Sequence, residues 1–265
     1  MGRVSVLGCG WFGLPMAASL VKRGHEVTGS VRTGSKLSKL ESCGIEPVII
    51  NLDEELDFIE QKHFLDCETL IISIPPTTGI AKSHFEQVKE FLLQVNDNSI
   101  KIIYISSTSV YVDNNNLVTE KNIEIPVKGN GAILRQTENY IRENFSNSVV
   151  LRFGGLIGPD RNPAKYFAGR KNIPGGKNPV NLVHLDDCMQ ICNILIEEKF
   201  IPGIYNVCSP EHPTRAEFYT HSAEVLQLEK PEFQNTFTPH KIVSPELLLK
   251  TFNYTFKFNS PMQMI

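Results

Sequence analysis

The sequence lacks several features that would assign it to a class of protein at once. No apolar run approaches the ~20 residues of a membrane-spanning helix, and no charged-then-apolar leader precedes the first motif. We therefore expect a cytoplasmic protein without a membrane partner. The formal net charge of the 265 residues is only −3, which gives no electrostatic drive toward nucleic acid.

The six cysteines form no Cys-x-x-Cys pair. Cys188 and Cys192 are four residues apart on an expected helix, which places them on one face, but the other ligands of a zinc site are missing. We interpret all six as reduced thiols of a cytoplasmic protein and predict no metal site. The sequence also contains no internal repeat and no low-complexity tract.

The first 24 residues contain a strand, a glycine-rich turn and a helix. An apolar strand leads into Gly8, Gly10 and Gly13, in the spacing Gly-x-Gly-x-x-Gly, with Trp11 and Phe12 between the last two. In this setting the first glycine permits a tight turn, the second lets a pyrophosphate approach the backbone, and the third lets helix and strand pack closely. The helix N-terminus adds N–H groups and a positive dipole end. The alternative is a plain structural turn.

The second strand, expected over 25–29, points to the form of the nucleotide. No Asp or Glu follows it, where many nicotinamide enzymes carry a carboxylate for the ribose 2′-hydroxyl. Arg32 instead offers a guanidinium to a 2′-phosphate, and Ser30 and Thr33 offer hydroxyl groups. This segment favours NADP(H) over NAD(H). The alternative is a solvated loop that contains one arginine.

Apolar strands and amphipathic helices then alternate, which predicts an α/β fold with a doubly wound parallel sheet of Rossmann type. Further strands are expected at 46–51, 69–74, 101–105, 148–153, 181–185 and 203–208. Helices are expected at 36–43, 84–95, 188–198 and 244–250, and the helix at 188–198 is capped by Asp186 or Asp187. Another helix begins at Thr214, with Glu217 as its capping-box partner, and an acidic, partly helical connection spans 53–64. Ligands of such sheets lie beyond the carboxyl ends of the strands. The loop through Ile74, Pro75, Pro76 and Thr77 should therefore pass beside the cofactor, unless it is only a rigid turn.

Hydroxyl side chains follow the strand at 101–105. They belong to Ser106, Ser107, Thr108 and Ser109. At the carboxyl end of a central strand, such a run lies where substrate and nicotinamide would meet. Gly154 and Gly155 similarly loosen the backbone after Phe153, as expected where a ligand passes a strand end.

Taken together, these motifs resemble the short-chain dehydrogenase/reductase superfamily, in its extended NAD(P)-dependent epimerase/dehydratase branch and its atypical YeeZ-like group. The resemblance is carried, in the family's order, by residues 8–13, 106–111, 151–159, 181–187 and 204–207. The glycine turn and residues 31–33 also resemble β-hydroxyacid dehydrogenases. The helical-bundle signature of that family is missing, and the hydroxyl run decides against it.

The resemblance implies a Rossmann domain of residues 1–155, completed by 181–208, and a small substrate-binding lobe of 156–180 and 209–265. The cofactor contacts expected are those of the glycine turn (Gly8, Gly10, Trp11, Phe12 and Gly13), together with Ser30, Arg32, Thr33, Ile74, Pro75, Pro76, Ser106, Phe153, Gly154 and Gly155. The resemblance implies that Ser107 is the catalytic hydroxyl and that Thr108 and Ser109 touch the substrate. A homodimer follows by the same analogy.

Five other positions bear on the comparison with the family pattern. Tyr111 is a second catalytic candidate, with packing against the loop as the alternative. Arg161 belongs to a basic stretch at 159–180 that suits an anionic substrate such as a nucleotide sugar, or that is simply solvated. His184 is a candidate for substrate binding and for acid/base chemistry, with a structural role in closing the site as the alternative. The family's Tyr-x-x-x-Lys pair is replaced by Asn130 and Leu134, when aligned on Glu138, and neither ionises near neutral pH.

Two functions remain open at this point. One is an NADP(H)-dependent epimerase/dehydratase or oxidoreductase that acts on a small polar substrate, for which a nucleotide sugar is one option. The other is a catalytically silent NADP(H) sensor that regulates a partner. The Asn130 and Leu134 replacements favour the sensor, whereas the hydroxyl run and the polar 159–180 stretch favour the enzyme, which we adopt.

Overall fold

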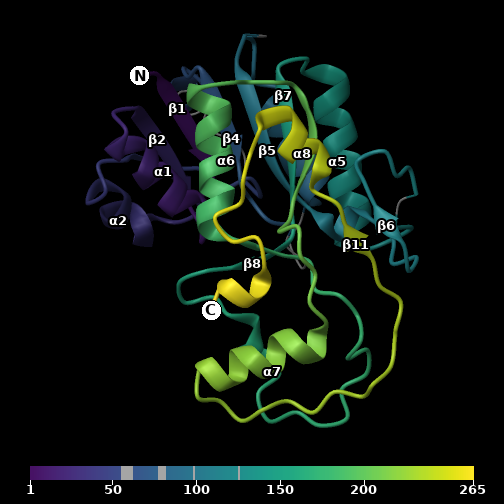
Figure 1. Ribbon diagram of the computed structural model, residues 1–265. Helices are drawn as coiled ribbons and strands as arrows, with labels where there is room; N and C mark the ends of the chain where they lie inside the picture. The colour runs from purple at the N-terminus through teal and green to yellow at the C-terminus, as the bar shows by residue number, and fades with distance from the viewer. Residues whose placement is uncertain (55–61, 77–81, 98, 125) are drawn as a thin grey trace. The chain divides into compact units, whose positions relative to one another are not determined.

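A seven-stranded sheet forms the centre of the computed structural model, which describes residues 1–54, 62–76, 82–97, 99–124 and 126–265 (Figure 1). Its strand order is β10-β7-β5-β4-β1-β2-β3, and β1 pairs in parallel with both β2 and β4. The strands are β1 (Arg3–Leu7), β2 (Glu26–Val31), β3 (Glu46–Ile49), β4 (Thr69–Ile72), β5 (Lys101–Ser107), β7 (Ser148–Phe153) and β10 (Gly203–Val207). The order reverses at β1, which is the doubly wound arrangement that the sequence predicts.

Helices lie between the strands of this sheet along the chain, and the last two helices follow its last strand, β10. They are α1 (Gly13–Lys22), α2 (Leu37–Glu41), α4 (His84–Leu92), α5 (Asn130–Asn144), α6 (Leu185–Glu197), α7 (Arg215–Val225) and α8 (Glu246–Phe252). Short strands pair as β11 (Ile242–Val243) with β6 (Leu117–Val118) and as β8 (Gly155–Ile157) with β9 (Leu182–His184). Single 3-10 turns are η1 (Gly34–Lys36), η2 (Thr108–Val110), η3 (Pro163–Tyr166) and η4 (Pro261–Gln263).

The chain divides into two compact units. The first consists of Met1–Ser106, Val127–Leu151 and Cys192–Ile204, and the second of Ser107–Pro126, Arg152–Ile191 and Tyr205–Ile265. The lobe expected from 156–180 and 209–265 lies wholly within the second unit, which also takes in the hydroxyl run from Ser107 onward.

The first unit owes its core to strands that are apolar on both faces. Val6 of β1 and Leu70 of β4 are fully buried, as are Met16 and Leu20 on the inner side of α1. Continuous apolar strands of this kind are typical of parallel sheets covered on both sides. The core thereby holds the carboxyl ends of β1, β2 and β4 together, and the glycine turn begins at that edge.

The second unit contains a buried carboxylate that corrects one expectation. Asp186 or Asp187 was expected to cap a helix over 188–198, but α6 begins at Leu185, so both residues lie in its first turn. The Asp187 carboxylate is buried instead, and it accepts hydrogen bonds from the Tyr254 hydroxyl (2.7 Å), the Lys257 N–H (2.7 Å) and the Phe258 N–H (3.3 Å). The cap prediction was wrong because this carboxylate anchors the C-terminal segment.

Most element boundaries differ from the expected ones by a few residues. The strand at 148–153 is confirmed, as is the capping box of Thr214 and Glu217 at the start of α7. The helix expected at 36–43 is divided into η1 and the short α2. Most of the acidic connection at 53–64 lies outside the described residues, as does Thr77. Among the described residues, no helix is both long and apolar enough to cross a membrane.

A buried histidine makes the first unit sensitive to acid. His84 opens α4 with 1% exposure, and its Nε2 lies 2.7 Å from the Tyr104 hydroxyl. Burial lowers the pKa of His84 from 6.5 to about 4. The folded protein therefore holds a neutral imidazole over a range in which the unfolded chain already binds a proton.

We predict that the free energy of unfolding falls as the pH is lowered from 6.5 to 4. The contribution of His84 is at most about 1.4 kcal/mol per pH unit, because only the unfolded state protonates in this window. Urea unfolding at several pH values should show a shallower acid dependence for His84→Gln than for the unmodified protein. Equal slopes for the two proteins would contradict the assignment.

Candidate functional site

The glycine turn after β1 is held in place by the ends of two neighbouring strands. Gly8 has a φ of +97°, which favours glycine. Its N–H donates to the Ser30 hydroxyl oxygen (2.9 Å), and the Cys9 N–H donates to the Ser30 carbonyl oxygen (2.8 Å). The Ser73 hydroxyl, directly after β4, donates to the Gly8 carbonyl oxygen (2.7 Å). These hydrogen bonds fix the turn at the carboxyl ends of the strands.

The second and third glycines have different surroundings. A Cβ atom added to Gly13, at the start of α1, would lie 2.1 Å from the Gly8 carbonyl oxygen. A Cβ atom added to Gly10 would meet nothing within 4 Å. Gly13 is thus required for helix and strand to approach each other, whereas Gly10 faces open space at the turn.

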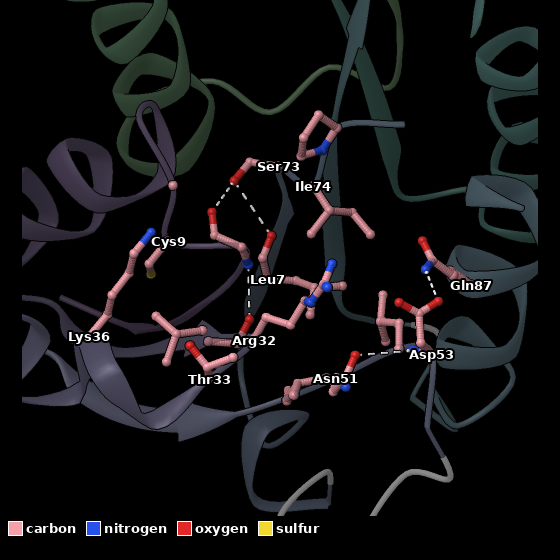
Figure 2. Close-up of a pocket in the computed structure, with 17 residues that line it drawn as sticks. Leu7, Cys9, Arg32, Thr33, Lys36, Asn51, Asp53, Ser73, Ile74 and Gln87 are labelled. Carbon is pink, nitrogen blue, oxygen red and sulfur yellow. Dashed lines mark hydrogen bonds between the residues drawn. The ribbon is translucent and has the colours of Figure 1, made fainter. Parts of the chain in front are cut away.

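A pocket of about 250 Å³ opens beside this turn, at the carboxyl ends of β1, β2, β3 and β4 (Figure 2). Of the predicted cofactor residues, those that line it are Gly8, Gly10, Ser30, Arg32, Thr33, Ile74 and Pro75. The Arg32 side chain extends into the pocket (Figure 2). Within the part of the chain that the structure describes, neither Arg32 nor Lys36 forms an ion pair with a carboxylate. The pocket therefore offers two cationic groups to a ligand.

Several lining residues were not predicted from the sequence, among them Lys36, Asn51, Asp53 and Gln87. The Asp53 carboxylate accepts a hydrogen bond from the Gln87 amide (2.9 Å), and its N–H donates to the Asn51 side-chain oxygen (3.3 Å). Asp53 and Asn51 follow β3, so the rule that ligands lie beyond strand ends could have indicated them. Gln87 lies on α4, where no motif indicates a ligand contact.

Other predicted cofactor residues lie outside the lining of this pocket. They are Trp11, Phe12, Gly13, Pro76 and Ser106. The Ser106 hydroxyl is buried and donates to the Glu138 carboxylate (2.6 Å), which is itself fully buried. Ser106 thus joins β5 to α5 inside the first unit.

The second unit has a pocket of its own, of about 390 Å³. Its predicted members are Ser107, Thr108, Ser109, Gly154 and Gly155. The hydroxyls are presented by η2, where the Ser107 Oγ accepts the Ser109 N–H (3.1 Å). This bond uses one of the two lone pairs of the oxygen and leaves the O–H donor of Ser107 for a ligand.

Tyr111 belongs to a buried network of the second unit. It is 2% exposed, its hydroxyl donates to the Asn206 side-chain oxygen (2.7 Å), and it accepts from Arg152 (2.6 Å). Burial, the largest effect, raises the pKa of Tyr111. The residue does not line the hydroxyl pocket. These contacts favour the packing alternative over a catalytic role.

The remaining candidates also lie outside the lining of the hydroxyl pocket. Phe153 is buried at the end of β7, and Arg161 is exposed. His184 accepts the Asp186 N–H (3.1 Å) and packs on the Phe258 ring at 4.3 Å between centroids. Burial is the main reason why the pKa of His184 is lowered.

The residues at the two positions of the Tyr-x-x-x-Lys pair, Asn130 and Leu134, belong to the first unit and cannot transfer a proton there. Asn130 is the exposed first residue of α5, and Leu134 is buried at 3% exposure. Neither supplies an ionisable group. All six cysteines are free thiols, and the described residues contain no group of three or more His, Cys, Asp or Glu arranged to hold a metal.

Comparison with known proteins finds one family and several solved structures that resemble the chain. No family model matches it. Protein YeeZ of Escherichia coli K12 is 34% identical over 272 residues, covering 100% of this chain and 99% of YeeZ. UDP-glucuronic acid 4-epimerase of Bacillus cereus, solved in complex with NAD, is 19% identical with a TM-score of 0.79, covering 99% of this chain and 95% of that one. ADP-L-glycero-D-manno-heptose-6-epimerase of Helicobacter pylori is 15% identical with a TM-score of 0.78, covering 99% and 94%.

The sheet order and the glycine turn define a Rossmann-like α/β protein with the epimerase/dehydratase fold, as the resemblance implied. At 34% identity over its whole length, the chain belongs to the YeeZ family.

We predict that one of two alanine variants of the turn is destabilised and the other is not. Gly13→Ala should destabilise the protein by about 1–3 kcal/mol, since its Cβ atom would collide with the backbone oxygen of Gly8. Gly10→Ala adds the same methyl group in open space and serves as the matched control, with an unfolding midpoint close to that of the unmodified protein. Thermal unfolding followed by circular dichroism measures both. A destabilised Gly10→Ala together with an unaffected Gly13→Ala would contradict the geometry.

Proposed function

We propose that the protein is an NADP(H)-dependent oxidoreductase or epimerase of the epimerase/dehydratase type, acting on a small polar substrate. The observation that carries the proposal is the position of Arg32, which extends into the pocket beside the glycine turn (Figure 2). No carboxylate follows β2 at the position that would receive a ribose 2′-hydroxyl.

The pocket chemistry supports the phosphorylated nucleotide. Arg32 and Lys36 are exposed cations, and the Thr33 hydroxyl lies between them in sequence. A guanidinium matches a phosphate in a bidentate fashion, which a ribose hydroxyl cannot exploit equally. The Asp53 carboxylate is held by Gln87 and offers an acceptor to the amino group of adenine. Gly10 leaves room for the diphosphate at the backbone.

The hydroxyl pocket supports a reaction at a carbonyl or hydroxyl group. A bound nicotinamide would supply or accept the hydride. Ser107 would donate its O–H to the reacting oxygen, because the bond from the Ser109 N–H engages a lone pair of Oγ and not its proton. The fold shared with epimerases that act on nucleotide-linked sugars supports this class of chemistry, and a nucleotide sugar is one substrate to test.

A second candidate is a catalytically silent NADP(H) sensor. It is favoured by Asn130 and Leu134, which replace the pair that carries the proton in the family pattern. A panel of sugar nucleotides, aldehydes and ketones, incubated with NADPH or NADP+ and analysed for both cofactor and substrate, separates the two candidates. An oxidoreductase changes the oxidation state of the cofactor, an epimerase converts the substrate while regenerating the cofactor, and the sensor does neither.

We predict that Arg32→Ala weakens NADPH binding by about tenfold or more, as expected for a charge-assisted hydrogen bond of about 1.5–3 kcal/mol. NADH binding should change by less than twofold. Lys39→Ala, an exposed cation on α2 outside the pocket, is the matched control and should leave both affinities unchanged. Titration calorimetry gives all six values. Equal affinity for NADPH and NADH in the unmodified protein would overturn the NADP preference.

For the catalytic hydroxyl, we predict that Ser107→Ala lowers kcat by about 100-fold or more on any substrate found in the panel, since the donor to the reacting oxygen is lost. NADPH affinity should stay within twofold. Tyr111→Phe is the comparison, because Tyr111 lies outside the pocket, and it should retain turnover while lowering the unfolding midpoint. If turnover is lost with Tyr111→Phe and kept with Ser107→Ala, the assignment is wrong.

A further inference from the structure

The hydroxyl pocket contains two cations that the sequence motifs did not indicate. Arg215 is the first residue of α7, and Lys241 directly precedes β11. Both line the pocket with Ser107 and Ser109, and none of its described lining residues carries a carboxylate. A pocket with two cations and several hydroxyls is suited to a negatively charged ligand group.

Arg215 is fixed by contacts on its flanks. One guanidinium nitrogen donates to the Pro174 carbonyl oxygen (2.9 Å). The guanidinium lies over the rings of Phe167 and Phe233, at 5.3 Å from each centroid. The Tyr219 ring, which also lines the pocket, stacks on Phe233 at 5.9 Å. A guanidinium has five N–H donors, so the bond to Pro174 leaves donors on the same plane for a ligand.

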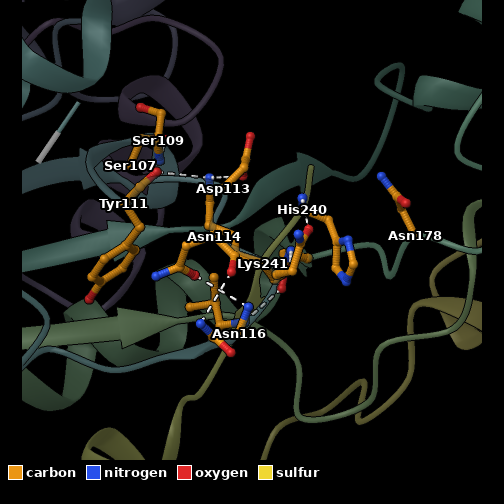
Figure 3. A network of polar contacts seen from close by, with 12 residues as sticks. Ser107, Ser109, Tyr111, Asp113, Asn114, Asn116, Asn178, His240 and Lys241 are labelled. Atoms are coloured by element: carbon orange, nitrogen blue, oxygen red, sulfur yellow. Dashed lines mark hydrogen bonds and ion pairs between the residues drawn. The ribbon is translucent and has the colours of Figure 1, made fainter. Parts of the chain in front are cut away.

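Lys241 is held by residues that directly follow the hydroxyl run in the chain (Figure 3). Its Nζ donates to the Tyr111 carbonyl oxygen (3.0 Å) and to the Asp113 carboxylate (2.7 Å), and its side chain is 15% exposed. The Asn181 amide donates to the Lys241 carbonyl oxygen (2.9 Å). An ammonium group has three donors, so one remains after these two bonds. Asp113 offsets the charge of Lys241, and Arg215 leaves the pair with a net positive charge.

We propose that Arg215 and Lys241 bind an oxyanion of the substrate, a carboxylate or a phosphate, next to the reacting group that Ser107 holds. That the bound anion is part of a substrate rests on the proposed function. The substrate class is then a small hydroxy or oxo compound that carries such an acidic group. The cavity of about 390 Å³ is of the size that holds small molecules. Arg161 and the other exposed cations of the 159–180 stretch are not needed for this recognition.

The test uses the full-length, isotope-labelled protein without cofactor. Inorganic phosphate and malonate are added in separate titrations, at ionic strength held constant with sodium chloride, while backbone amide signals are followed by NMR. We expect saturable shifts at Ser107, Ser109, Gly154 and Gly155. The anion that binds more tightly identifies phosphate or carboxylate as the group recognised.

Three variants locate the binding. Arg215→Gln and Lys241→Gln should each weaken the anion affinity at least tenfold. Lys165→Gln, which removes an exposed cation of the 159–180 stretch outside the pocket, should change it less than twofold. Should Lys241→Gln fail to fold, Arg215→Gln and the charge-preserving Arg215→Lys decide, with Arg215→Lys expected to fall between Arg215→Gln and the unmodified protein.

Each outcome separates this proposal from the proposed function. Absence of shifts, equal affinities in all variants, or shifts confined to Gly10, Arg32 and Thr33 would overturn the oxyanion site. NADPH is then titrated into the same sample. If NADPH binds but phosphate and malonate cause no shifts, the cofactor proposal stands and the oxyanion site is overturned. If the anions cause shifts but NADPH does not bind, the oxyanion site stands and the cofactor proposal is overturned.

Discussion

The site in the first unit depends on the hydrogen bonds that tie the glycine turn to the ends of β2 and β4. Ser30 receives two consecutive N–H groups, from Gly8 and Cys9, and Ser73 donates to the Gly8 carbonyl oxygen. That same oxygen limits how closely α1 can approach, because only a residue without a Cβ atom fits at Gly13. The position of the helix N-terminus, and with it the shape of the pocket, follows from these few contacts.

A second constraint is the charge placed around each pocket. The first pocket carries Arg32 and Lys36, and the second carries Arg215 and Lys241. Each set accompanies hydroxyl or backbone groups, with one carboxylate near it: Asp53 lines the first pocket, and Asp113 pairs with Lys241. The net charge of the chain is −3, so the positive groups at these pockets are a local arrangement and not a consequence of composition.

Much of the first unit could be predicted from the sequence, because its signals are local. Strand patterns are read from neighbouring residues, and the spacing of Gly8, Gly10 and Gly13 and the missing acid after β2 both fall within the first third of the chain. The hydroxyl pocket could be predicted only in part. Lys241 reaches Asp113 from 128 positions away, and no periodic pattern records a contact over that separation. Nearness in sequence can also mislead: Tyr111 lies four positions after Ser107 but does not line the pocket.

The central claim is that the glycine turn holds a diphosphate while Arg32 holds a further phosphate. A crystal structure of the protein grown with NADPH tests it most directly. The account predicts diphosphate oxygens within hydrogen-bond distance of backbone N–H groups at the start of α1, and the 2′-phosphate against the Arg32 guanidinium. A diphosphate bound elsewhere, or a 2′-phosphate that points to solvent away from Arg32, would contradict it.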